Sequence, residues 1–391
     1  MPTSSLHVVI LIYFYEPDLK TPGALLDRYS TIRPFAESLH KEGAEVTVLQ
    51  RFHKPDRFSD KGVCYEFHAD ECEPNLPKWQ IPRSFHLAVR NACARDPLMQ
   101  TAVHVQGLLY PLQTRFLRRV LPHGCTVVAQ HHAEKPWRSV RRPLQQWGLR
   151  RVDGFFFAAR NLADSWIDEG LISQKQQIFE VMEGSTDFRW QERPLATSRT
   201  GFMGSPTILW VGNLTPNKDP LTVLAGFEQI LEQVQDARLY MVFRGTDLLA
   251  AVSDRIRSSS SLSRKVTLLG SVDHQKLEDI YNSSDYFVLG SHYEGSGFAL
   301  AEATACGVVP VVTAIPSFIK MTDNGRIGAC WAPGDADAFR AAFLQVLRQP
   351  VQDVSNRARR FFDEQLSYPA IARASVRAYK EVIAKRAGPE K

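Results

Sequence analysis

Short apolar runs recur along the chain, and most are followed by a turn and then by a segment in which apolar residues repeat at helical spacing. In the first half, the strands predicted in this way lie at residues 8–15, 46–49, 63–67, 102–107, 126–132 and 154–159. Continuous apolar strands are typical of parallel sheets that helices cover on both faces. We therefore expect an α/β fold here, with one helix at residues 25–41 and mostly loops at residues 54–82.

The same alternation restarts at Thr207, with strands predicted at residues 208–212, 239–243, 266–270, 286–289 and 308–312. Pro220 is placed as the first residue of a helix, because proline fits the first helical turn. Residues 189–206 are rich in Pro, Ser, Thr and Gly, as linkers are. The predicted organisation is an N-terminal domain at 1–190, a C-terminal domain at 207–365, and a tail at 366–391 that carries a last helix at 370–384.

Composition supports this organisation and narrows the function. A length of 391 residues favours two domains. The formal charge of +5 is small for this length, and no arginine block or aromatic ladder is present, which disfavours nucleic-acid binding. The six cysteines form no C-x-x-C pair and suit a reduced compartment. No apolar run is long enough to span a bilayer, so we expect a cytoplasmic protein.

A strand, a glycine turn and a helix start are predicted between Tyr286 and Ala303. Glu294 is expected in the turn, and Glu302 one or two turns inside the helix. Gly295 and Gly297 would let a ligand approach the backbone, and free N–H groups at the helix start would attract anions. The pattern favours a site for a ligand that carries phosphate and hydroxyls. A helix-capping loop with two solvated glutamates is the alternative.

Other polar residues stand at predicted strand ends, where open α/β sheets keep their chemistry. Lys218 precedes the helix at Pro220 and is placed to hold phosphate, with a solvated surface lysine as the alternative. His131 and His132 end a strand of the first half and are catalytic candidates, although a histidine so placed is more often structural. Pro22 and Gly23 are expected in the loop after the first strand.

An arginine-rich stretch runs from Trp137 to Arg151, with Leu144, Trp147 and Leu149 between its charges. As a basic amphipathic helix, it would contact an anionic membrane or an anionic acceptor. A solvated helix face is the alternative.

The order of motifs in the second half resembles a known family. It runs through residues 209–214, Lys218 and Asp219, then residues 266–270, 281–285, 294–302 and 306–312. This succession is similar to retaining glycosyltransferases with the GT-B fold, of the group 1 type (family 4), and the resemblance is strong over residues 207–347. The first half matches more weakly, through His104, through His131 and His132, and through residues 183–187.

The resemblance implies two Rossmann-like domains that face each other across a cleft, with the last helix crossing back to the N-terminal domain. The N-terminal domain would bind the acceptor and the C-terminal domain the nucleotide sugar. Glu302 would hold the ribose hydroxyls, and Lys218 would neutralise the departing diphosphate. Glu294 would bind the donor sugar and diphosphate together with the backbone of Gly295, Ser296, Gly297 and Phe298. The family's catalytic histidine falls on His131 or His132, and neither a metal nor another cofactor is required.

Three positions depart from the family pattern. Asn213 stands where the family usually has an arginine, and Arg244 in a neighbouring loop is a candidate for the missing charge. Glu183 replaces an asparagine in the turn at residues 183–187. The family's glycine-rich first loop is reduced to Pro22 and Gly23.

The expected function is transfer of a hexosyl group from a nucleotide-diphosphate sugar to a glycan, lipid-linked or small-molecule acceptor, with retention of configuration. The protein would act in polysaccharide or glycoconjugate biosynthesis. A peripheral membrane contact through Trp137 to Arg151 stays open. Asn213 keeps a second interpretation open, a GT-B module or partner subunit that binds nucleotide sugars without turnover. A sugar-nucleotide epimerase of the same fold is the third.

Overall fold

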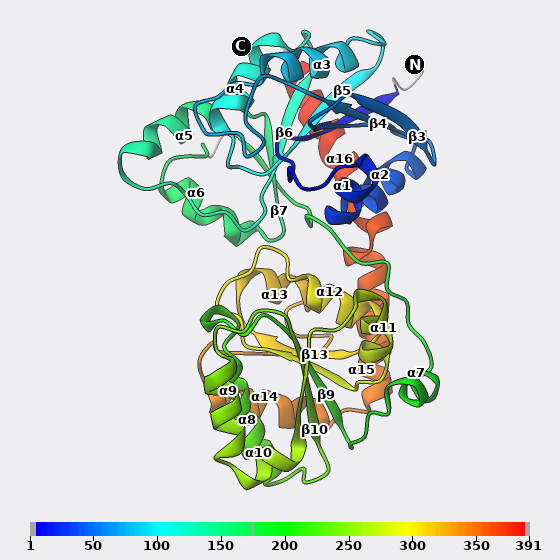
Figure 1. Ribbon diagram of the computed structural model, residues 1–391, viewed down its shortest axis with the longest axis vertical. Coiled ribbons are helices and arrows are strands. Elements are labelled where there is room, and N and C mark those ends of the chain that lie inside the picture. Colours follow the sequence, from blue (N-terminus) through cyan, green and yellow to red (C-terminus); the bar gives the residue numbers. More distant parts are fainter. Residues whose placement is uncertain (1–4, 174–175, 388–391) are drawn as a thin grey trace. The chain divides into compact units, whose positions relative to one another are not determined.

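The computed structural model describes residues 5–173 and 176–387, and the chain divides into two compact units (Figure 1). The N-terminal unit comprises Met1–Gly184 and Tyr368–Lys391, and the C-terminal unit comprises Ser185–Ser367. Each unit is a sheet between layers of helices, which confirms the predicted α/β class with two Rossmann-like units.

The N-terminal unit is built on an eight-stranded sheet with the order β3-β4-β2-β1-β5-β6-β7-β8. All neighbours pair in parallel except β3 and β4. The chain first builds the side of β1 that holds β2, β3 and β4, and then crosses to build the other side from β5 to β8. The strand order therefore reverses between β1 and β5. The strands are β1 (Leu6–Ile12), β2 (Glu45–Arg51), β3 (Asp56–Asp60), β4 (Val63–His68), β5 (Gln100–Gln106), β6 (Thr126–Gln130), β7 (Gly154–Phe157) and β8 (Gln177–Glu180).

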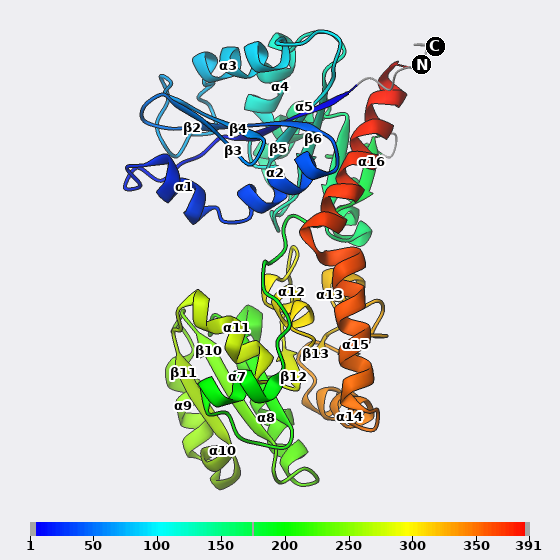
Figure 2. The same cartoon turned by 90° about the vertical axis from the view of Figure 1, so that its right-hand side faces the viewer.

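Helices cover both faces of this sheet (Figure 2). Helix α2 packs against β2 and α16, while α3 and α4 contact each other on the other face. The helices are α1 (Pro22–Arg28), α2 (Ile32–Lys41), α3 (Arg83–Cys93), α4 (Pro111–Val120), α5 (Arg142–Leu149), α6 (Asp164–Asp168) and α16 (Tyr368–Ala387), with short 3₁₀ turns η1 (Ser139–Arg141) and η2 (Arg160–Ala163).

Helix α16, the last of the chain, is part of the N-terminal unit. It contacts α2, β5 and β6, and its Tyr379 hydroxyl is hydrogen-bonded to His104 Nδ1 of β5. His104 is fully buried, and burial, with a smaller contribution from His132, lowers its pKa to about 3. His104 is therefore a neutral structural residue that anchors α16 to the sheet.

The C-terminal unit contains a parallel six-stranded sheet with the order β11-β10-β9-β12-β13-β14. Its strands are β9 (Thr207–Gly212), β10 (Arg238–Phe243), β11 (Val266–Gly270), β12 (Tyr286–Leu289), β13 (Val309–Thr313) and β14 (Ala329–Trp331). Its helices are α7 (Arg193–Thr200), α8 (Pro220–Leu231), α9 (Leu249–Arg257), α10 (Ser260–Lys265), α11 (His274–Asn282), α12 (Phe298–Ala305), α13 (Pro316–Met321), α14 (Ala336–Leu347) and α15 (Val351–Phe361), with the turns η3 (Pro216–Lys218) and η4 (Phe362–Leu366).

Three expectations about local structure were wrong. The single helix at residues 25–41 is two helices, α1 and α2, separated by a short turn. Pro22 and Gly23 are the first two residues of α1, which Thr21 caps, and do not lie in the preceding loop. The segment 189–206 contains α7, which packs on α11 and pairs Arg199 with Asp279 at 2.5 Å.

The arginine-rich stretch forms only a short helix, α5. Leu149 is buried, and Trp147 lies under the Arg115 guanidinium at 3.7 Å from its ring centroid. Part of the apolar side of this stretch is therefore occupied by packing against α4.

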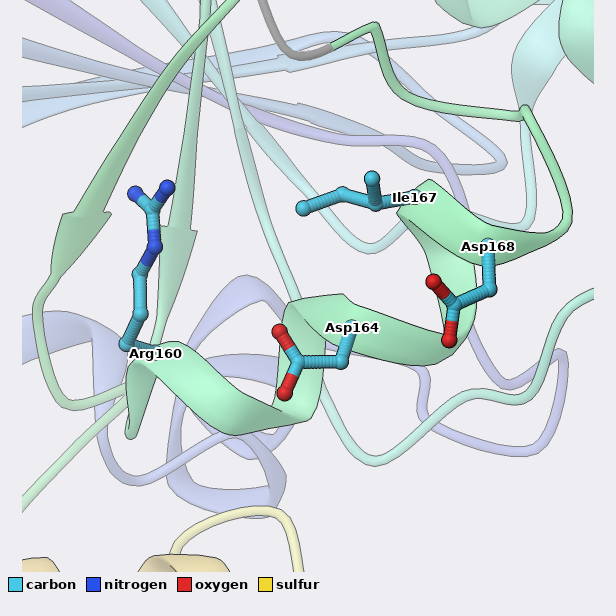
Figure 3. A pocket seen from close by; sticks show the side chains of 4 residues that line it. All are labelled: Arg160, Asp164, Ile167 and Asp168. Carbon is cyan, nitrogen blue, oxygen red and sulfur yellow. The ribbon is translucent and has the colours of Figure 1, made fainter.

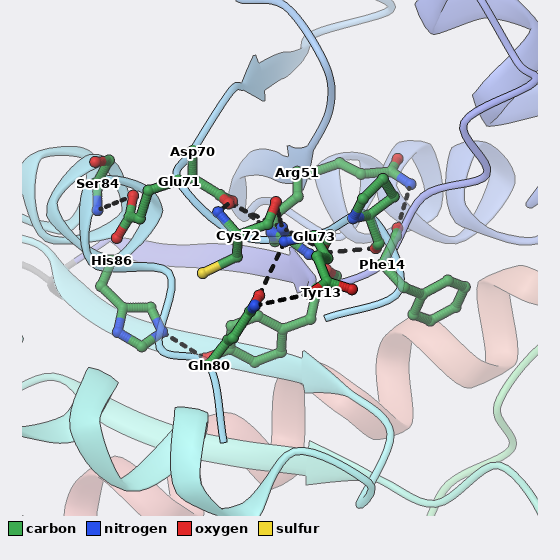
Figure 4. Close-up of polar contacts among 12 residues, drawn as sticks. Tyr13, Phe14, Arg51, Asp70, Glu71, Cys72, Glu73, Gln80, Ser84 and His86 are labelled. Atoms are coloured by element: carbon green, nitrogen blue, oxygen red, sulfur yellow. Dashed lines mark hydrogen bonds and ion pairs between the residues drawn. The ribbon is translucent and has the colours of Figure 1, made fainter. Parts of the chain in front are cut away.

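A buried arginine organises the loop at residues 70–75, which carries no regular apolar pattern (Figure 4). Arg51, at the end of β2, forms a bidentate ion pair with Asp70, and both side chains are buried. Its remaining N–H groups donate to four backbone carbonyls, those of Tyr13 (2.9 Å), Cys72 (3.2 Å), Glu73 (2.9 Å) and Pro74 (3.3 Å). A single side chain thus ties this loop to the end of β1.

Candidate functional site

The carboxyl ends of β9, β10 and β12 lie together at one edge of the C-terminal sheet, because these strands are parallel neighbours. From β9 the chain first continues to β10 on one side and later returns to β12 on the other. Ligands of open α/β sheets bind at such a reversal of strand order. The loops after β9 and β12 carry Lys218 and Glu294, so both residues belong to this edge.

Lys218 and Glu294 form an ion pair at this edge. Lys218 Nζ lies 2.5 Å from Glu294 Oε1, and the two side chains are 20% and 14% exposed. The predicted placement of Glu294 before the helix and of Lys218 beside the start of α8 is confirmed. The structure thus brings together, within one unit, the cation and the carboxylate that sequence reasoning placed on separate loops.

Further contacts join these two loops. Asn217 donates from its side-chain amide to the carbonyl of Tyr293 at 3.0 Å and accepts the His292 N–H at 2.8 Å through its own carbonyl. Asp219, which caps α8, lies 3.1 Å from His292 Nε2. Gly290 must be glycine, because a Cβ there would lie 2.9 Å from the Asp219 carbonyl oxygen. Lys218 is therefore held on a rigid loop.

The glycine turn leads directly into α12. Gly297 caps this helix with a φ of +69°, and a Cβ there would lie 2.5 Å from the Phe318 ring. Ser317 donates to the carbonyl of Glu294 at 3.2 Å, which fixes the turn against α13. The first N–H groups of α12 have no partner within the helix, so this turn presents partial positive charge beside Lys218.

Glu302 lies inside α12, as predicted, and its two oxygens have different partners. The hydroxyl of buried Tyr281 donates to Oε2 at 2.8 Å, and His274 Nε2 lies 3.4 Å from Oε1. The hydrogen bond with Glu302 raises the pKa of His274, with burial and the charge of Arg244 opposing it. Glu302 is thus a fixed carboxylate that can accept ligand hydroxyls.

Asn213, which stands where the resembled family usually has an arginine, has a structural role. Its side-chain oxygen accepts the Gly245 N–H at 3.1 Å and so connects the loops after β9 and β10. Arg244 is exposed in the second of these loops, on the His274 side of the edge.

The two histidines of the N-terminal unit have different environments. His131 is buried, stacks on Phe157 at 4.7 Å between ring centroids, and has its Nε2 2.9 Å from the carbonyl of Glu134. Burial lowers its pKa. His132 is exposed at the next position, beyond the end of β6. Of the two, only His132 has a ring that a ligand can reach.

Two oxygen acceptors hold the His132 ring. Nδ1 lies 2.6 Å from Glu183 Oε2, and Nε2 lies 2.7 Å from Gln106 Oε1. Burial by itself lowers the pKa of His132, but the Glu183 hydrogen bond and the charges of Glu183 and Glu134 outweigh it, so the pKa is raised. Contacts from both ring nitrogens to oxygen suit the protonated form.

Sequence reasoning missed several residues that build these two groups. Glu134 bridges two strand-end loops, because its carboxylate accepts the N–H groups of Leu108 (2.8 Å) and His132 (2.5 Å). Glu183 appeared only as a departure from a family turn, and its ion pair with His132 explains the carboxylate. Tyr281 appeared only as part of the motif at residues 281–285, and no local pattern marked His274 or His292.

Two hollows of the N-terminal unit lie beside α1 and beside α6. One of about 700 Å³ lies beyond the end of β1 and beside α1, and it is lined by Phe14, Tyr15, Glu16, Pro17, Arg28, Tyr29, Glu73, Pro74 and Asn75. The other, about 580 Å³ and polar, lies along η2 and α6, where Asp164 and Asp168 extend from the same helix (Figure 3). The first adjoins α1, so Pro22 and Gly23 influence it through the helix that they begin.

Across residues 5–173 and 176–387, no group of three or more His, Cys, Asp or Glu side chains is arranged to hold a metal ion. In the same ranges, no helix combines the length and apolar content that crossing a bilayer requires.

Comparisons with known proteins bear on the C-terminal unit first. Residues 197–361 match the family model of glycosyl transferases group 1. Mannosylfructose-phosphate synthase of Agrobacterium fabrum is 33% identical over 171 residues, which are 41% of this chain and 37% of that protein. The GDP-mannose:cellobiosyl-diphosphopolyprenol alpha-mannosyltransferase of Xanthomonas oryzae is 25% identical over 231 residues, 58% of this chain and 59% of that protein. The chain thus spans less than two thirds of the length of either relative.

The fold has solved counterparts over almost the whole chain. Sucrose-phosphate synthase from Thermosynechococcus elongatus superposes with a TM-score of 0.69 and 18% identity, covering 96% of this chain and 99% of that one. At this identity the likeness concerns the fold alone, which is GT-B. The family match rests on the segment that contains Lys218, Glu294 and Glu302. Residues 197–361 of this chain are thus similar to the group 1 glycosyltransferases.

Proposed function

We propose that the chain transfers a sugar from a nucleoside diphosphate sugar to an acceptor hydroxyl, with retention of configuration and without a bound metal ion. The observation that carries this proposal is the meeting of Lys218 and Glu294 where the strand order reverses, beside the start of α12. We assign donor binding to this edge of the C-terminal unit. Acceptor binding is assigned to the N-terminal unit.

In the proposed reaction, the diphosphate of the donor replaces Glu294 as the partner of Lys218. The bond between the sugar C1 and the diphosphate oxygen breaks, and the diphosphate leaves with the electron pair. The acceptor oxygen bonds to C1 on the same face, and its proton passes to a phosphate oxygen of the leaving group. The Lys218 ammonium and the N–H groups at the start of α12 stabilise the negative charge that develops on the diphosphate.

Glu302 is proposed to accept hydrogen bonds from the ribose hydroxyls, with Tyr281 holding its carboxylate in place. GDP-mannose is the first donor to test, because the Xanthomonas relative is named for that donor. The aromatic rings of Phe14 and Tyr29 in the hollow beside α1 suit the apolar face of a sugar acceptor.

Glu302→Ala is expected to weaken donor binding by about 10- to 100-fold, because hydrogen bonds to a charged group contribute about 1.5–3 kcal/mol. Turnover of bound donor should change little. Calorimetric titration of the donor, together with KM and kcat, measures this division. Glu232→Ala, an exposed glutamate after α8, is the control and should bind donor normally. Unchanged donor affinity in Glu302→Ala would contradict the assignment.

His132 is proposed to act as the charged histidine of the N-terminal unit, whereas His131 supports the fold. With the pKa of His132 raised, its ion pair with Glu183 stabilises the fold fully below the unfolded pKa of about 6.5, and this contribution is lost as the pH rises through the raised value. The transfer rate should fall over the same range. Glu183→Gln should lower the pKa of His132 and move this fall to lower pH.

A pH–rate profile of kcat/KM tests this role of His132. Glu169→Gln, an exposed glutamate on the same unit, should leave the profile unchanged. If Glu183→Gln and the wild type share one profile, His132 does not act through its charge.

A second candidate function, donor binding without turnover, is favoured by Asn213, which uses its side-chain oxygen for the Gly245 N–H and brings no charge. Donor binding with no product from any extracted glycan or lipid acceptor, and with affinity unchanged in Lys218→Ala, would support it over transfer.

A further inference from the structure

A cluster of positively charged side chains lies in the N-terminal unit, at the amino ends of β6 and β7. His132 lies at the other end of β6, beyond its carboxyl end. A hollow of about 290 Å³ opens there, lined by Arg115, Arg118, Arg119, Leu121, Pro122, His123, Arg151 and Arg386. These residues come from the end of α4, the turn before β6, the turn before β7 and the end of α16. We call this set the arginine hollow.

The arginine hollow is separate from the proposed reaction site. It adjoins the amino ends of β6 and β7, whereas Gln106 and His132 follow the carboxyl ends of β5 and β6. The five residues of β6 span about 16 Å at the usual rise of a strand. A ligand in the arginine hollow would therefore not contact His132.

Little negative charge compensates these arginines. Asp153 uses one oxygen for the Val127 N–H (2.8 Å) and the other for Arg386 (2.8 Å), and its charge also acts on Arg118. Within residues 5–173 and 176–387, no carboxylate lies within ion-pair distance of Arg118, Arg119 or Arg151.

The environment of Arg115 shows the effect of placing several arginines close together. Its guanidinium is held on the Trp147 ring, and Nη1 donates to the Trp147 carbonyl at 3.0 Å. Its Nε is buried and has no partner among the described residues. Burial and then the charges of Arg151, Arg119 and Arg150 lower its pKa. The folded unit thus keeps like charges together at a cost in free energy that a bound anion would offset.

We propose that the arginine hollow binds a compact phosphate-bearing anion. Planar guanidinium groups match phosphate oxygens in pairs, and a volume of this size has room for a phosphate or diphosphate group. Such a group belongs either to a small soluble molecule or to an anionic lipid headgroup.

Pyrophosphate titration at constant ionic strength tests the proposal in the Lys218→Ala background, which removes the lysine proposed to bind diphosphate at the donor site. Saturable 1:1 binding is expected, with amide protection from hydrogen exchange near residues 118–124 and 150–153. Arg118→Gln/Arg119→Gln should weaken this binding at least tenfold. The control Arg138→Gln/Arg141→Gln, two exposed arginines outside the hollow, should not.

Co-sedimentation with phosphatidylglycerol vesicles identifies the source of the anion. Pyrophosphate binding that Arg118→Gln/Arg119→Gln abolishes supports a soluble ligand, and vesicle binding alone with the same loss supports a lipid headgroup. Failure of both ligands to bind, or binding that this variant leaves unchanged, overturns the proposal. Neither outcome depends on sugar transfer.

The salt dependence of thermal stability reports the repulsion among these arginines without any added ligand. At about 10 mM salt, where the Debye length is about 30 Å, Arg118→Gln/Arg119→Gln should raise the thermal midpoint, and the gain should vanish at 1 M salt. A lower midpoint at low salt would contradict uncompensated repulsion among these arginines.

Discussion

Lys218→Ala is expected to lower the rate of sugar transfer by about 100- to 1000-fold, the usual range when one group that stabilises the charge of a transition state is removed. Lys218 is the cation that the structure holds against Glu294 at the edge of the C-terminal sheet. Without it, the departing diphosphate loses its main counter-charge and meets the unpaired carboxylate of Glu294. Single-turnover kinetics with saturating donor measure the effect on the chemical step.

Two further variants make this result specific. Lys276→Ala removes an exposed lysine from α11 and should retain the wild-type rate. Lys218→Ala/Glu294→Gln removes the repelling carboxylate as well, so donor affinity should partly recover while the slow turnover remains. A Lys218→Ala enzyme within threefold of the wild-type rate would remove Lys218 from the mechanism.

Arg51→Met is expected to destabilise the N-terminal unit by about 3–5 kcal/mol, the usual cost of breaking a buried ion pair from one side. The substitution leaves the buried Asp70 carboxylate without its cation and removes the hydrogen bonds that Arg51 donates to four backbone carbonyls. Urea unfolding measures the loss, and hydrogen exchange of residues 70–76 reports local opening of the segment.

Arg57→Met provides the control, because Arg57 lies on β3 with its side chain 64% exposed, and its partner Glu66, at 3.2 Å, also pairs with Arg95. Because the Arg57 side chain is exposed and Glu66 keeps its pair with Arg95, this variant should lose only about 0–1 kcal/mol and remain close to the wild type. Arg51→Met/Asp70→Leu should not recover stability, since the hydrogen bonds from Arg51 to the backbone carbonyls are still lost. Equal unfolding midpoints for Arg51→Met and Arg57→Met would show that the buried contacts contribute little.

The loops after β9 and β12 were predictable because the residues that specify them are consecutive in the sequence. The apolar run before Gly290, the glycines at 295 and 297 and the helix formers after Phe298 specify a strand, a turn and a helix start in consecutive residues. That order placed Glu294 in the turn and Glu302 in the helix, where the structure has them. Pro220 fixed the start of α8 in the same way.

Contacts between distant residues were not predictable. The ion pair of His132 with Glu183 joins loops after different strands, and no spacing rule relates the two residues. The different environments of the adjacent residues His131, which is buried, and His132, which is exposed, were not predictable from the sequence either. The loop held by Arg51 follows polar contacts rather than apolar periodicity, so its conformation left no pattern to read. Helix α7 was missed because Pro, Ser and Thr in residues 193–200 are also typical of linkers.

The edge formed by the loops after β9 and β12 is proposed to bind a nucleoside diphosphate sugar. Calorimetric titration of the wild-type chain with GDP-mannose, and then with UDP- and ADP-sugars, tests it most directly. The account predicts 1:1 binding of at least one donor, weakened about 10- to 100-fold in Glu302→Ala by the loss of charged hydrogen bonds and unchanged in Glu232→Ala. Absence of binding to all of these donors, or equal affinity in the wild type and Glu302→Ala, would contradict it.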